Sequence, residues 1–122
     1  MEDIEVKEPL RLDDGLHTGQ IVRVEDRETP QGYNYVDVYI KEQESELELK
    51  WGAPRSGSTE SKLMKTLANF TDIKAGIQVN PAVILADKEV TFMTMKEKKG
   101  DKEYVKIVDG SLKPAVTQEA VQ

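Results

Sequence analysis

The sequence contains no cysteine and only one histidine, His17, among its 122 residues. It can therefore form neither a disulfide framework nor a thiolate metal site, and one histidine cannot supply a histidine cluster. No run approaches the roughly 20 apolar residues of a membrane span, and the acidic start does not resemble a secretory signal. These absences predict a cytoplasmic protein with no membrane association, no metal and no cofactor.

Catalytic motifs are equally scarce. There is no Walker-type phosphate loop, nucleophile elbow or dinucleotide glycine pattern, and the glycine-containing run 52–57 lacks the lysine that a phosphate loop needs. His17 follows Asp13 and Asp14, but one histidine beside two acids is more typical of a loop than of an acid–base or metal site. We therefore expect no enzymatic activity.

The net charge of −6 argues at first against a polyanionic partner, because phosphate binding depends on lysine and arginine. The acidic residues are unevenly distributed, however. Residues 1–14 carry six acids and two bases, whereas residues 55–114 carry 11 bases and eight acids. One side of the folded chain is therefore expected to be locally basic.

A chain of this length accommodates one compact domain. Residues 1–14 are charged, contain Pro9 and lack a clean period, so we interpret them as a flexible acidic arm. Residues 115–122 are interpreted as a flexible C-terminal tail, which leaves a single folded domain over residues 15–114.

Three tyrosines alternate with apolar residues over residues 33–40. Side chains of a strand point to opposite faces in turn, so Val36, Val38 and Ile40 are expected in the core. The tyrosines, with Asp37, are then expected on the opposite face. Exposed rings on a rigid sheet stack on unpaired nucleobases at roughly 1–3 kcal/mol per base, without sequence preference. Contact with another protein chain, or structural filling, would give the same pattern.

Strands are predicted over residues 15–29, 33–40, 46–51, 89–96 and 103–112. Gly19 allows the first strand to bend, and Pro30 with Gly32 predicts a tight turn into the tyrosine strand. A helix is expected after the Ser- and Thr-containing loop 56–59, with an apolar stripe between Leu63 and Phe70. Residues 71–87, in which Pro81 acts as a breaker, have no predicted element.

Three strands, one helix and a returning hairpin are the element order of an OB-fold, a five-stranded Greek-key barrel. With its glycine-broken first strand, its tyrosines and the helix start Ser61-Lys62-Leu63, the region 15–114 resembles the small OB-fold single-stranded-DNA-binding proteins of bacteriophages, archaeal viruses and cellular replication. The resemblance implies binding of single-stranded DNA in replication or recombination, in the cytoplasm, the nucleoid or a virus-infected host cell.

The resemblance also implies a track of side chains across the second strand. The implied nucleic-acid contacts are Arg23, Tyr33, Tyr35, Tyr39, Lys50, Trp51, Arg55, Lys62, Lys98, Lys99 and Lys106. For Trp51, its parity with Leu47 and Leu49 favours the core, whereas its place at the end of a strand also suits a groove. Lys98 and Lys99 belong to a charged turn for which a solvated loop is the simpler interpretation.

Several alternatives stay open at the level of sequence. An OB-type protein-interaction module or accessory subunit, without nucleic-acid binding, competes with the single-strand binder. Stacking and phosphate contacts serve DNA and RNA alike. Oligomeric state and replication or recombination partners are also undetermined. Phe92, Met93 and Met95 are expected to pack in the core rather than to form a binding surface.

Overall fold

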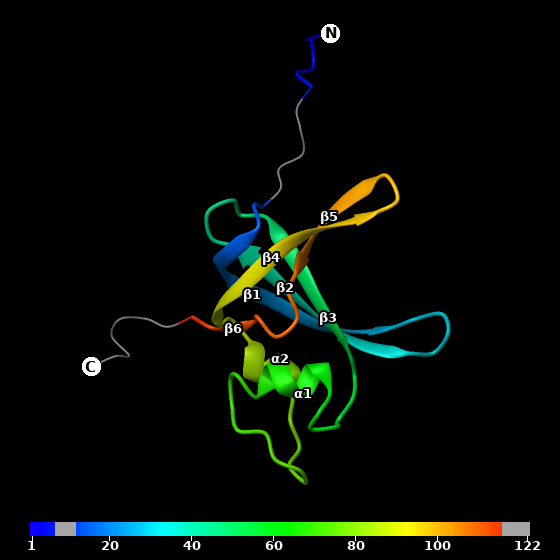
Figure 1. The fold of residues 1–122 in the computed structure, drawn as a ribbon, viewed down its shortest axis with the longest axis vertical. Coiled ribbons are helices and arrows are strands. Elements are labelled where there is room, and N and C mark those ends of the chain that lie inside the picture. The colour runs from blue at the N-terminus through cyan, green and yellow to red at the C-terminus, as the bar shows by residue number, and fades with distance from the viewer. Residues whose placement is uncertain (7–11, 116–122) are drawn as a thin grey trace, which may run out of the picture.

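The computed structural model describes residues 1–6 and 12–115 of the chain. The six strands of the described part form one antiparallel sheet in the order β3-β2-β1-β4-β5, with β6 paired to β4 (Figure 1). The strands are β1 (Gly15–Glu28), β2 (Asn34–Glu42), β3 (Glu48–Pro54), β4 (Glu89–Lys99), β5 (Lys102–Ile107) and β6 (Lys113–Pro114). The expected mainly β architecture is confirmed. The expected count of five strands is wrong, because Lys113 and Pro114 pair with Thr91 and Val90 as a sixth strand.

Two short helices, α1 (Lys62–Leu67) and α2 (Pro81–Leu85), lie together at one end of the sheet (Figure 1). The sequence predicted only one helix and treated Pro81 as a breaker. Pro81 instead begins α2, where its missing N–H would have no intrahelical partner in any case. The Asn80 side chain caps this helix, because its Oδ1 accepts from Ala82 N at 3.0 Å.

Helix α1 begins at Lys62, so the predicted helix start Ser61-Lys62-Leu63 is confirmed. Ser61 is the N-cap, and its Oγ accepts a hydrogen bond from Met64 N at 3.1 Å. The helix buries Leu63 and Leu67, which carry the predicted apolar stripe into the core. It ends at Leu67, so Phe70 packs against the core from beyond the helix.

The interior follows the alternation of β2. Val36, Val38 and Ile40 are each at most 1% exposed, as their period of two predicted. Trp51 on β3 is 2% exposed, so the interpretation that places it in the core is confirmed. These side chains pack with Phe92 of β4 and with the helices in one hydrophobic core.

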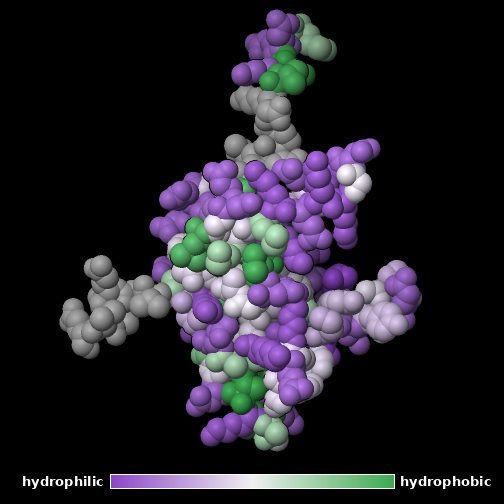
Figure 2. All heavy atoms as spheres, in the orientation of Figure 1, coloured by the Kyte–Doolittle hydropathy of each residue, from purple (hydrophilic) through white to green (hydrophobic). Residues whose placement is uncertain are grey.

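The expectation for β4 is only partly confirmed. Phe92 is fully buried, but Met93 and Met95 are 46% and 47% exposed, because they alternate with Phe92 and point to the other face. Leu16, 69% exposed, is the register partner of Met93 on β1. Figure 2 shows apolar side chains gathered on the face where β4 crosses β1.

The turn between β1 and β2 forms as predicted. The two strands pair antiparallel, from Gly19 opposite Glu42 to Glu28 opposite Asn34. Gly32 adopts a φ of 88°, which glycine tolerates without steric cost. Gly19 permits a close approach of β2, since a Cβ there would lie 2.6 Å from the carbonyl oxygen of Lys41. The close pairing of β1 with β2 therefore depends on the absence of a side chain at this position.

Residues 12–14, which the sequence assigns to the arm, contact the sheet. Leu12 is 5% exposed within the core, Thr94 Oγ1 donates to Asp13 O at 2.8 Å, and Lys96 N donates to Asp14 Oδ1 at 3.0 Å. Residues 7–11 of the predicted arm and residues 116–122 of the predicted tail lie outside the described residues.

Candidate nucleic-acid interface

A β-bulge in β1 sets the geometry of the candidate site. Ile21 pairs with Ile40 and Arg23 pairs with Tyr39, so Val22 is an extra residue without a partner on β2. The bulge reverses the parity of the strand. Ile21 and Val24 therefore both face the core, although they are three residues apart, and Arg23 faces outward beside Tyr39.

Two arginines of β1 cover two tyrosines of β2. Arg23 Cζ lies 3.8 Å from the ring centroid of Tyr39, and Arg27 Cζ lies 4.7 Å from that of Tyr35. Arg23 and Tyr39 are register partners, and so are Arg27 and Tyr35. The two arginines are four residues apart on β1, as the two tyrosines are on β2. We call these four residues the arginine–tyrosine ladder. Its rings are half-buried, whereas the Arg23 and Arg27 side chains are 46% and 44% exposed.

The ladder differs from the uncovered rings that the sequence suggested. A guanidinium covers one face of each ring, an arrangement that a cation–π attraction favours. This arrangement still offers flat stacking surfaces to solvent, because unpaired bases stack on guanidinium planes as well as on aromatic rings. It also brings two guanidinium groups to this face of the hairpin, each paired with at least one carboxylate.

A buried carboxylate holds the centre of the ladder. Asp37, 1% exposed, accepts from Arg27 Nε at 2.7 Å and from Arg27 Nη2 at 3.3 Å. The hydrogen bond with Asp37 is the main cause that raises the pKa of Arg27. Gly52 on β3 is the register partner of Asp37, and a Cβ there would lie 2.7 Å from Asp37 Oδ1. The carboxylate thus occupies the space that a side chain at position 52 would need.

Acidic side chains also surround Arg23. Its Nη1 lies 2.7 Å from Glu48 Oε1, and its Nε lies 3.0 Å from Glu25 Oε1. Burial lowers the pKa of Arg23, but the two carboxylates outweigh that effect and the pKa is raised. Any phosphate that binds Arg23 must therefore compete with these carboxylates.

Four more of the predicted residues gather where β3 faces β5 and the start of α1. Lys50, Trp51, Lys62 and Lys106 line one cavity of about 230 Å³. Lys50 is also the register partner of Tyr39, which makes this cavity the neighbour of the ladder. The predicted residues of the ladder are thus Arg23, Tyr35 and Tyr39, and Lys50 links them to the cavity that Trp51, Lys62 and Lys106 also line.

The other predicted residues belong neither to the ladder nor to the lining of this cavity. Tyr33 is 66% exposed and precedes β2 by one residue, in the turn from β1. Arg55 forms an ion pair with Asp26 and lines a separate cavity of about 390 Å³ beside α1. Lys98 and Lys99 are exposed in β4, next to its turn into β5.

Sequence reasoning missed Arg27. The signal was present, because Arg23 and Arg27 have the same spacing of four as Tyr35 and Tyr39 across a predicted hairpin. It also missed Asp37 as a buried group, since its parity with the tyrosines indicated an exposed position.

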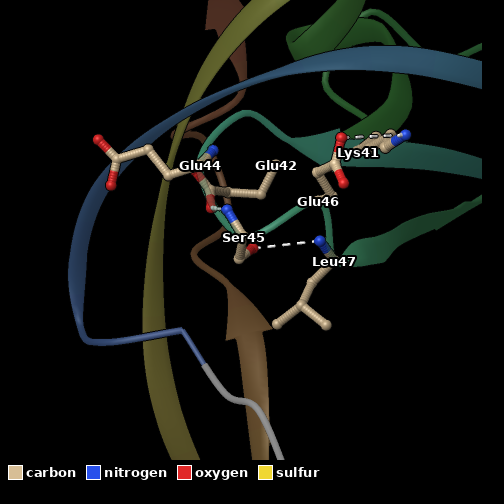
Figure 3. Close-up of polar contacts among 6 residues, drawn as sticks. All are labelled: Lys41, Glu42, Glu44, Ser45, Glu46 and Leu47. Carbon is tan, nitrogen blue, oxygen red and sulfur yellow. Dashed lines mark hydrogen bonds and ion pairs between the residues drawn. The ribbon is translucent and has the colours of Figure 1, made fainter.

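A second polar cluster forms the turn between β2 and β3 (Figure 3). The Glu42 carboxylate, 3% exposed, accepts from Glu44 N at 3.0 Å and from Ser45 N at 2.8 Å. Burial raises the pKa of Glu42, but these amide hydrogen bonds outweigh it and lower the pKa. Ser45 Oγ in turn accepts from Leu47 N at 3.1 Å. The cluster fixes the turn that leads into β3.

No protein-family model matches the chain, and no curated protein matches its sequence. Within residues 1–6 and 12–115, no three histidine, aspartate or glutamate side chains are grouped so that they could hold a metal ion. Neither helix of that part is long and apolar enough to cross a membrane.

Proposed function

We propose that this protein binds single-stranded nucleic acid, with DNA as the first candidate, through the arginine–tyrosine ladder and the adjacent lysines. The observation that carries the proposal is the stacking of Arg23 on Tyr39 and of Arg27 on Tyr35. These pairs form two stacking platforms on the paired strands β1 and β2. Because stacking is indifferent to base identity, binding has little sequence preference. Such an activity would serve replication or recombination.

The proposal includes an OB-type barrel for the sheet. An OB-fold is a five-stranded, partly open Greek-key barrel that binds oligonucleotides on the face of its second and third strands. The order β3-β2-β1-β4-β5 suits this architecture, and β3 and β5 line one shared cavity at the ends of that order. The ladder and Lys50 lie on β1, β2 and β3, where the binding face of such a barrel is expected.

The acidic neighbours set the expected strength of binding. Arg23 is paired with Glu25 and Glu48, so its guanidinium exchanges one set of anions for another when a phosphate binds. Exposed ion pairs contribute little, typically about 0–1 kcal/mol, and are readily replaced. We therefore expect moderate affinity at low salt that declines steeply as salt rises.

The test is fluorescence anisotropy with a labelled oligo-dT of about 20–30 nucleotides, repeated with double-stranded DNA and with single-stranded RNA. The double variant Tyr35→Leu/Tyr39→Leu keeps apolar volume at both half-buried positions but removes the stacking rings. Loss of two stacked bases at roughly 1–3 kcal/mol each predicts at least a tenfold weaker Kd. Tyr104→Leu, on the separate β5 hairpin, is the matched control and should bind more like the wild type. Absence of binding by the folded wild-type protein at low salt would refute the proposal.

A second candidate function is a protein-interaction module or accessory subunit. The exposed apolar side chains of Leu16, Met93 and Met95 on the β1–β4 face favour it, because such groups often mark protein contacts. Light scattering tests this candidate. A stable oligomer that dissociates in Leu16→Gln/Met93→Gln, with unchanged DNA binding, would assign this face to protein contact.

A further inference from the structure

The cavity between β3, β5 and α1, which we call the seam cavity, has a volume of about 230 Å³. Lys50, Lys62 and Lys106 line it, with Asp109 as the acidic residue of its wall. Lys62 Nζ is 2.9 Å from Asp109 Oδ1, and Lys106 Nζ is 3.7 Å from Glu97 Oε2. Lys50 has no ion pair with the described residues. The wall thus carries more positive than negative charge.

Trp51 also lines this cavity, and its indole N–H is unpartnered. Its Nε1 is the one buried side-chain nitrogen or oxygen of the described residues that has no hydrogen-bond partner. Leaving a buried donor unsatisfied costs about 1–3 kcal/mol, so native proteins rarely do so without a reason. An acceptor from outside the chain would remove this cost.

Stacking of a base on the indole ring is not the role that the geometry favours, because Trp51 is only 2% exposed. Lys62 Nζ also lies over the ring, 5.1 Å from its centroid. The indole N–H is then the group of Trp51 that can bind a ligand. The ligand that suits an N–H donor beside three lysines is an anion with oxygen acceptors, and a phosphate has this chemistry.

We propose that the seam cavity holds a backbone phosphate of the bound single strand, with Trp51 Nε1 donating a hydrogen bond to a phosphate oxygen. This inference rests on the proposed function, since Lys50 joins the cavity to Tyr39 of the ladder. Lys50 and Lys62 neutralise the phosphate charge. Because Nε1 is buried, the wall of the cavity must rearrange before a phosphate reaches it, and the surface pair of Lys62 with Asp109 in that wall separates at low cost.

The chain has a single tryptophan, so its indole N–H gives one cross-peak in a ¹H–¹⁵N NMR spectrum. Titration of the full chain with oligo-dT is expected to move this cross-peak downfield, as a hydrogen bond to an anionic oxygen forms. Trp51→Phe keeps an aromatic ring but removes the donor, and should weaken oligo-dT binding roughly 5- to 10-fold. If Trp51→Phe does not fold, Lys50→Gln and Lys62→Gln should each reduce the cross-peak shift. Lys65→Gln, exposed on α1, should not.

The outcomes separate this inference from the proposed function. If anisotropy reports oligo-dT binding while the indole cross-peak stays in place, the inference is overturned and the single-strand binder stands. If oligo-dT does not bind at all, a titration with tripolyphosphate, followed by the indole cross-peak, tests separately whether the seam cavity binds an anion. A downfield shift then supports a site for free polyphosphate, and no shift overturns the site.

Discussion

Arg27 Nε donates a hydrogen bond of 2.7 Å to Asp37 Oδ2, and this carboxylate is buried although its guanidinium partner is half-exposed. The pair joins β1 to β2 at the centre of the ladder, where Glu25 and Asp37 are register partners. Its geometry therefore links the stability of the hairpin to the position of one stacking platform.

Asp37→Asn is expected to destabilise the protein by about 1–3 kcal/mol, because the amide loses the charge-assisted hydrogen bonds and presents a donor to Arg27. Urea unfolding measures this loss. Glu25→Gln removes the same charge at the exposed register partner and should change stability by less than about 0.5 kcal/mol. Equal losses in both variants would contradict a special role for the buried carboxylate.

Gly52→Ala is expected to destabilise the protein by about 1–3 kcal/mol, because the new Cβ would lie 2.7 Å from Asp37 Oδ1 and force the carboxylate to move. Thermal unfolding checks the effect. Gly57→Ala is the matched control, since no atom lies within 4 Å of its added Cβ.

The clash also predicts coupling between positions 37 and 52. In an Asp37→Ser background the carboxylate is absent, so Gly52→Ala should lower the free energy of unfolding by less than it does in the wild type. Strictly additive losses would show that the glycine acts through its backbone rather than through Asp37.

Local patterns predicted the parts of this fold that depend on local physics. The period of two in β2 identified Val36, Val38 and Ile40 as core residues, since strand geometry alone decides which face they occupy. The bulge at Val22 was not predictable, because Ile21 and Val22 are both apolar and either could face inward.

The candidate site was also predictable only where it depends on local sequence patterns. The tyrosines of β2 were visible in the sequence, but their arginine partners depend on a register that the bulge sets. The burial of Asp37 depends on a glycine of a third strand and on Arg27. Neither contact follows from the neighbours of Asp37 in the sequence.

Protonation of Glu42 should destabilise the protein in acid. Its pKa is lower in the folded chain than in the unfolded chain, so the ionised carboxylate stabilises the fold above the ordinary glutamate pKa of about 4.3. This contribution is lost as the pH falls through the folded-state pKa. Glu42→Gln should therefore lower Tm at neutral pH. The difference in Tm between this variant and the wild type should shrink as the pH falls toward about 3. Calorimetry measures both effects, and Glu44→Gln, which replaces an exposed glutamate of the same turn, should change Tm much less at neutral pH.

Glu48→Gln is expected to strengthen binding of single-stranded DNA several-fold, because it removes the carboxylate 2.7 Å from Arg23 and frees that guanidinium for phosphate. The slope of log K against log salt should steepen by about 0.7, the value for one further phosphate contact on a single strand. Anisotropy titrations over a range of salt concentrations measure both. Glu44→Gln changes the net charge equally but lies in the turn after β2, away from Arg23. If both variants gain the same affinity with unchanged slopes, net charge alone governs binding and Arg23 is not a phosphate contact.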